Sequence, residues 1–207
     1  MRQTFVVTGT DTDIGKTVFA AGLSAALDAD YWKPVQAGLD DGSDSERVER
    51  LGVPSSRIVP ESYRLTTPCS PHRAAEIDGC VIDTEKLAMP QGSRPLVIEG
   101  AGGALVPVTR KLLFADVFAT WQAPVIIVAR TALGTINHTL LTIEALRARG
   151  ATVFGVAFVG SPEEDSERTI CEIGAAKRLG RLPLLASLTA ETLRHAFAEN
   201  FDLGQFA

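Results

Sequence analysis

The sequence has few cysteines, no long apolar run and no leader segment. Cys69, Cys80 and Cys171 are odd in number and widely spaced, which fits reduced thiols better than a disulfide framework or a zinc cluster. The longest apolar runs, such as residues 124–129, are far shorter than the ~20 residues that cross a bilayer. The first residues lack the charged and apolar segments of a secretion signal. We therefore expect a cytoplasmic protein without a membrane span.

The sequence also lacks an excess of basic charge. Its net charge is -5 at pH 7 and its isoelectric point is near 5.3, which argues against the broad basic face that binds a nucleic acid backbone. Its 207 residues are 45% hydrophobic and 22% charged, as in soluble globular proteins. Without an internal repeat or a linker, residues 1–207 are predicted to form a single domain.

Short apolar runs alternate with helical patterns along the chain. The runs predict strands at residues 4–8, 31–35, 95–99, 124–128, 153–159 and 182–185. Helices are predicted at about residues 15–28, 46–51 and 136–147, from a capping box at 161–164 to about Leu179, and near the C-terminus around His195. This alternation predicts a doubly wound α/β fold with a mostly parallel sheet flanked by helices.

The segment from Thr8 to Thr17 reads TGTDTDIGKT and lies between the first strand and the first helix, where a P-loop belongs. The strict P-loop pattern requires glycine at position 10, but this chain has Thr10 there and Gly9 one residue earlier. Backbone N–H groups at the start of a helix bind phosphate oxygens, and a lysine adds positive charge. The predicted nucleotide-binding residues here are Asp13, Ile14, Gly15, Lys16, Thr17 and Val18.

A buried strand ends at Glu99 and continues into the glycine-rich turn Gly100, Ala101 and Gly102. A carboxylate there lies beside the P-loop at the C-terminal edge of a parallel sheet, where ligands bind in open α/β folds. Mg2+ prefers oxygen ligands and takes one or two carboxylates from protein. Glu99 and the hydroxyl of Thr17 are therefore predicted Mg2+ ligands, and residues 99–102 are predicted to contact the nucleotide.

Two further charged residues, Lys33 and Asp44, are candidates for the same site. Lys33 follows the apolar residues Tyr31 and Trp32, where a charge needs a partner, and a phosphate or an anionic substrate would be one. Asp44 lies in the acidic segment 40–46. Such a segment is usually solvated, so from the residues alone Asp44 is either a metal ligand or a surface acid.

Together these motifs resemble the dethiobiotin synthetase family along nearly the whole chain. The segments that carry the resemblance are GTDTDIGKT at 9–17, KPV at 33–35, SPH at 70–72, EGAGG at 99–103 and LGTINH at 133–138. The resemblance implies a homodimeric, Mg2+-dependent enzyme. It would convert 7,8-diaminopelargonic acid, CO2 or bicarbonate, and ATP to dethiobiotin, ADP and phosphate, through a carbamate and a phosphorylated carbamate.

The resemblance also implies roles for individual residues. Lys16 and Lys33 would stabilise negative charge as catalytic residues, and Thr17, Asp44 and Glu99 would hold Mg2+, with Asp44 also contacting the nucleotide. The predicted substrate-binding residues are Thr12, Asp13, Lys33, Gly134, Thr135, Ile136 and Asn137, the last four across the dimer interface.

The chain departs from the family pattern at two positions. Phe158 stands where the family often has an asparagine that contacts adenine, so either Phe158 stacks on the base or it packs in the core. In the second case, backbone groups of Leu182 and Pro183 are the predicted contacts of the base. Ala37 stands where the family commonly has a hydroxyl residue near the substrate.

Two other functions are compatible with a P-loop. A ligase that amidates cobyrinic acid would carry a glutaminase domain, for which a chain ending at Ala207 is expected to have no room. A partitioning ATPase would use its nucleotide state to switch partner binding, and such proteins usually add a basic or amphipathic surface. The acidic composition speaks against the second alternative.

Overall fold

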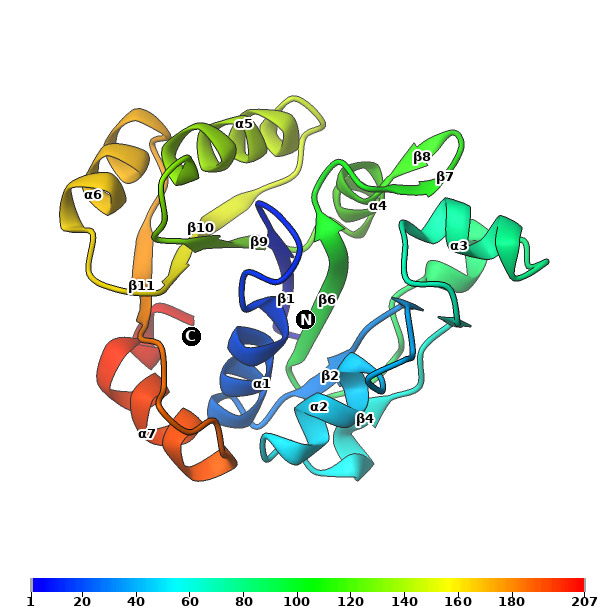
Figure 1. The fold of residues 1–207 in the computed structure, drawn as a ribbon, viewed down its shortest axis with the longest axis horizontal. Helices are drawn as coiled ribbons and strands as arrows, with labels where there is room; N and C mark the ends of the chain where they lie inside the picture. The colour runs from blue at the N-terminus through cyan, green and yellow to red at the C-terminus, as the bar shows by residue number, and fades with distance from the viewer. Residues whose placement is uncertain (1, 207) are drawn as a thin grey trace.

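The computed structural model describes residues 2–206, which are built around a parallel β-sheet (Figure 1). Within these residues the sheet has seven strands in the order β11-β10-β9-β1-β6-β2-β4, and all neighbouring pairs are parallel. The strands are β1 (Thr4–Gly9), β2 (Asp30–Trp32), β4 (Ile58–Val59), β6 (Leu96–Gly103), β9 (Val125–Arg130), β10 (Val153–Val159) and β11 (Arg178–Leu182). β1 therefore lies at the centre, between β9 and β6.

Two short strand pairs lie outside this sheet. β3 (Val35–Ala37) pairs in parallel with β5 (Tyr63–Leu65), and β7 (Pro107–Thr109) forms an antiparallel hairpin with β8 (Leu112–Leu113). Three 3-10 helices within the described residues, η1 (Ser55–Arg57), η2 (Thr84–Leu87) and η3 (Leu203–Phe206), complete the connections.

Helices cover both faces of the central sheet. α1 (Lys16–Ala26), α2 (Asp44–Arg50) and α7 (Ala190–Asn200) pack on one face, whereas α4 (Phe114–Trp121), α5 (Thr135–Arg147) and α6 (Glu164–Ile173) pack on the other. α3 (Pro71–Ile77) lies beside β5 and β7. Along β1, Val6 joins the core under α4 and α5, whereas Phe5 and Val7 join the core under α1. The predicted doubly wound α/β fold is confirmed.

The segment from residue 161 to residue 185 differs from the prediction. The capping box at 161–164 does not form, because Glu163 is the N-cap residue of α6 without a side-chain cap, and α6 ends at Ile173 rather than near Leu179. The last strand is Arg178–Leu182, not residues 182–185. The strand lacks the continuous apolar pattern from which strands are predicted, because it contains Arg178 and Arg181. Both pair with the buried carboxylate of Glu167 on α6, at 2.7 and 2.9 Å, and this pairing lets a strand with two arginines join the sheet.

Two strands near the P-loop also differ from the prediction. The expected strand 31–35 is interrupted at Lys33 and Pro34, and the chain leaves β2 there to form β3. Proline cannot donate a ladder hydrogen bond, which explains the break. β6 does not end at Glu99 but continues to Gly103. Within residues 2–206, no helix is both long and apolar enough to cross a membrane.

Candidate active site

A cavity of about 810 Å³ opens where β1, β2 and β6 end. Its wall contains the P-loop, the start of α2 and the segment before α3. The lining residues predicted from the sequence are Thr12, Asp13, Ile14, Gly15, Lys16, Thr17, Val18, Lys33, Asp44, Glu99, Ala101 and Gly102. Segments distant in the sequence therefore meet at the edge of the sheet where ligands of such folds bind.

The P-loop folds tightly around its own lysine. Gly15 adopts a left-handed conformation (φ 94°) as the N-cap residue of α1, which glycine does without strain. The shifted Gly9 also has a reason: a Cβ there would lie 2.6 Å from Ile14 Cδ1 and 2.9 Å from Lys16 Cδ. Lys16 Nζ donates to the backbone carbonyl of Asp11 at 2.7 Å. This hydrogen bond holds the lysine against its own loop.

A buried network of charges joins α1, α2, β2 and β6. Thr17 Oγ1 lies 3.0 Å from Asp44 Oδ1 and 2.8 Å from Glu99 Oε1. Lys33 Nζ lies 2.5 Å from Asp44 Oδ2 and 3.1 Å from Glu99 Oε1. Tyr31 donates its hydroxyl to Glu99 Oε2 at 2.7 Å. Asp44 is therefore not merely a solvated surface acid, because its carboxylate meets the candidate metal ligands.

The two lysines of the cavity have opposite pKa shifts. Burial lowers the pKa of Lys16, and it outweighs the attraction of Glu99 and Asp44. Burial also opposes the charge of Lys33, but Glu99 and Asp44 outweigh it and raise the pKa of that lysine. For Asp44, burial is outweighed by Lys33, and its pKa is lowered. Lys33 and Asp44 therefore form an ion pair at neutral pH.

The oxygen atoms of Thr17, Asp44 and Glu99 fit a magnesium ion. The two carboxylates each lie within hydrogen-bond distance of the Thr17 hydroxyl, and Mg2+ favours such hard ligands together with water and phosphate oxygens. Residues 2–206 contain no group of three or more acidic, histidine or cysteine side chains that could hold a metal. Two carboxylates and one hydroxyl match the small number of protein ligands that Mg2+ usually takes.

A smaller cavity of about 310 Å³ adjoins the other side of the P-loop and shares Asp13, Ile14, Gly15 and Val18 with the first. The remaining residues of its wall are Arg130, Val159, Leu182, Pro183, Leu184, Leu185 and Leu188. Leu184 is 75% exposed, so an apolar side chain of this wall is open to solvent. Phe158 is fully buried in the core under α4 and α5, which excludes its stacking on a ligand here.

Comparison with known proteins identifies the family. A family model described as an AAA domain matches residues 3–192. The chain is 66% identical over 204 residues to the ATP-dependent dethiobiotin synthetase BioD of Novosphingobium aromaticivorans, covering 98% of each chain. It is 62% identical to the protein of the same name from Rhizorhabdus wittichii, covering 100% of each chain. The chain belongs to the dethiobiotin synthetase family. The predicted resemblance is therefore confirmed, as is the prediction of an ATP-dependent ligase.

Solved structures outside the dethiobiotin synthetase family share the fold. A ParA family ATPase from Chlorobium tepidum matches with a TM-score of 0.56 at 12% identity, over 100% of this chain and 93% of that one. The cell division ATPase MinD of Pyrococcus furiosus matches with a TM-score of 0.54 at 12% identity, over 96% and 98%. At such low identity these matches establish the P-loop fold and carry no functional assignment.

Some residues expected to act in a dethiobiotin synthetase lie outside both cavities. Gly134 is the N-cap of α5, Thr135, Ile136 and Asn137 form its first turn, and none of the four lines either cavity. Their substrate-binding role stays a prediction that needs a second subunit. Gly100 does not line the cavity, but its carbonyl lies 3.4 Å from Lys33 Nζ.

Sequence reasoning missed several residues at the site of this dethiobiotin synthetase family member. Tyr31 lies two residues before Lys33 in the sequence, and that spacing was the available signal. Gln36 accepts a hydrogen bond from the backbone N–H of Asp44 at 3.1 Å, which holds the start of α2 against the cavity. Arg47 and Arg130 line the larger and the smaller cavity. No local motif marks these residues, because they reach the site only when segments distant in the sequence pack together.

Proposed function

We propose that the chain converts 7,8-diaminopelargonic acid, CO2 and ATP to dethiobiotin, ADP and phosphate. The observation that carries the proposal is the convergence of Lys16 and Thr17 of the P-loop with Lys33, Asp44 and Glu99 in one cavity. The curated relatives, at 66% and 62% identity, are named for this synthetase activity. The large cavity has room for the terminal phosphates and a small substrate side by side.

The proposed chemistry has three steps. One amine of the substrate attacks CO2 and loses a proton, which gives a carbamate. A carbamate oxygen then attacks the γ-phosphorus, and the bond to the bridging oxygen breaks as its electron pair leaves with ADP. Finally the second amine attacks the carbamate carbon and loses a proton, and phosphate leaves with the electron pair of the C–O bond, which closes the ureido ring. Each step creates or moves negative charge, so catalysis needs positioned cations more than a strong base.

The residues of the cavity fit these needs. Lys16, whose charge is opposed by burial, would bind the γ-phosphate. Lys33, buried and bonded to two carboxylates, would stabilise the carbamate and the phosphoryl group. Thr17, Asp44 and Glu99 would hold Mg2+, which when bound would neutralise charge on the phosphate oxygens. Thr12 and Asp13, on the cavity wall, would face the diamine.

The smaller cavity is the proposed site of the nucleobase. It adjoins the P-loop on the side away from Lys33, and its leucine-rich wall suits a flat aromatic ring. Leu182 and Pro183, which the sequence predicted as nucleotide contacts, line it. We further propose a homodimer in which residues 134–137 of one subunit bind the substrate carboxylate of the other, and a single P-loop domain over residues 1–207.

The decisive experiment is incubation of the protein with diaminopelargonate, bicarbonate, ATP and Mg2+, followed by mass analysis. Dethiobiotin is expected only when all four components are present, with one ADP formed for each product molecule. Hydrolysis of ATP at the same rate with and without the diamine, and without any dethiobiotin, would refute the proposal and favour a nucleotide switch.

A further inference from the structure

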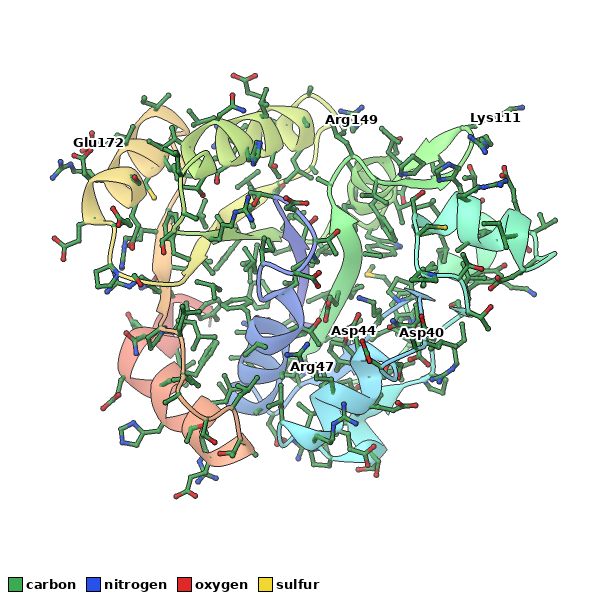
Figure 2. The ribbon with its side chains drawn as sticks, in the orientation of Figure 1. Asp40, Asp44, Arg47, Lys111, Arg149 and Glu172 are labelled. Atoms are coloured by element: carbon green, nitrogen blue, oxygen red, sulfur yellow. The ribbon has the colours of Figure 1, made fainter. Side chains whose placement is uncertain are left out.

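Arg47 is a cation on the wall of the larger cavity that the proposed mechanism leaves unused. It lies on α2, which begins at Asp44 (Figure 2), and both residues line the cavity. Its side chain is exposed, and among residues 2–206 it makes no ion pair and no side-chain hydrogen bond. Asp40 and Asp41 line the same cavity, yet neither pairs with it. Arg47 is therefore available to a ligand.

Several contacts hold α2 in place beside the cavity. Ser43 and Glu46 form a capping box at its start, and its own residues Ser45 and Val48 are buried. The Asp44 N–H bonds to Gln36, and the Asp44 carboxylate bonds to Thr17. Residues three apart on a helix lie on the same side, so Arg47 follows Asp44 along the edge of α2 that borders the P-loop.

We propose that Arg47 binds the terminal phosphoryl group of the nucleotide as it is transferred, a deepening that rests on the proposed function. Asp44, one turn earlier, lies 3.0 Å from Thr17 Oγ1, and both residues would help to hold Mg2+ beside the phosphates. A guanidinium one turn further along reaches the outer end of the triphosphate. Arginine suits this task, because its planar donors match phosphoryl oxygens in pairs.

The contribution of Arg47 to the transfer is electrostatic. While the bond from γ-phosphorus to the ADP oxygen breaks and the bond to the carbamate oxygen forms, Arg47 donates hydrogen bonds to the phosphoryl oxygens. It neither gives up nor accepts a proton, because guanidinium stays charged throughout the usable pH range. The contact should therefore strengthen ATP binding and also raise turnover. The affinity for ADP, which lacks this phosphoryl group, should not depend on Arg47.

The test compares Arg47→Ala with Arg50→Ala. Arg50 is a matched control, because it is an exposed arginine on the same helix, one turn further on, and it does not line the cavity. Dissociation constants for ATP and ADP with Mg2+, without diamine, are measured by calorimetry. Arg47→Ala should weaken ATP binding roughly tenfold, the usual loss of a charged hydrogen bond. Its ADP binding, and both constants of Arg50→Ala, should stay within about twofold of wild type.

Arg47→Lys separates charge from geometry, and it should restore only part of the ATP affinity and of kcat. Equal weakening of ATP and ADP by Arg47→Ala, or behaviour identical to Arg50→Ala, would overturn the proposal. A raised KM for the diamine with unchanged ATP affinity would overturn it as well, and would assign Arg47 to the substrate carboxylate. If the wild-type protein bound no ATP, the proposed function itself would fail, which distinguishes the two failures.

Discussion

The P-loop and the end of β2 each place a buried lysine in the same cavity, but the protein compensates their charges differently. Lys16 bonds to a backbone carbonyl, and burial lowers its pKa. Lys33 is clamped between Asp44 and Glu99, which raise its pKa. The first lysine is the proposed binder of an incoming anion, whereas the second already forms two ion pairs in the folded structure. The proposed roles therefore differ: Lys16 would serve binding alone, and Lys33 would serve both binding and stability.

The largest effect is expected for Lys33→Met, which keeps an apolar stem but removes the charge. Asp44 and Glu99 would lose their cation, so unfolding in urea should show a loss of about 3 kcal/mol, as for a broken buried ion pair. Turnover should fall at least about 100-fold, because charge stabilisation is lost. Lys111→Met, on the exposed β7–β8 connection at the margin of Figure 2, is the control. A stability equal to that of the control would contradict the role of Lys33 in the fold.

Lys16→Met should separate activity from stability. Turnover should again fall by about 100-fold, since a cation is removed from the phosphate site. The free energy of unfolding without nucleotide should change by less than about 1 kcal/mol, or rise, because a poorly compensated buried charge is removed. A destabilisation as large as that of Lys33→Met would contradict the prediction that only Lys33 contributes to the stability of the fold.

The smallest effect concerns the pH dependence of the Asp44 pair. The pKa of Asp44 is lowered, so its carboxylate stabilises the fold above the ordinary aspartate pKa and loses this contribution as pH falls through the lowered value. The pKa of Lys33 is raised, so its ammonium group contributes fully at every pH below the ordinary lysine pKa. Asp44→Asn should therefore be less stable than wild type at pH 7 by up to about 1 kcal/mol. Urea unfolding at pH 7 and pH 3 should show this difference shrinking in acid. A difference that grew toward pH 3 would have the wrong sign.

The P-loop was predictable because its function is local. Ten contiguous residues between a strand and a helix contain the glycines, the lysine and the threonine, and this local pattern predicts a phosphate site. The fold class followed from the alternation of apolar runs and helical patterns. Glu99 and Lys33 were found because each is a charge at the end of an apolar run, which requires a partner.

Other features depend on contacts between distant segments. Arg178 and Arg181 do not fit an apolar strand pattern, and their charges are compensated by Glu167 of α6, which only the folded structure brings to them. Phe158 could stack or pack by its sequence context, and its strand places it in the core. The smaller cavity joins residues 182–188 to Val18 and Val159, and no spacing in the sequence shows this.

By itself the sequence determined the phosphate loop, the layered α/β architecture and the residue types that could hold a metal, since these depend on local spacing and periodicity. The tertiary structure decided which charges meet: it joined Asp44 to Thr17, gave Lys33 two partners and Lys16 a carbonyl, and turned Arg47 toward the cavity. The physical reason is that electrostatic energies depend on distance and burial, which arise when separated segments pack together.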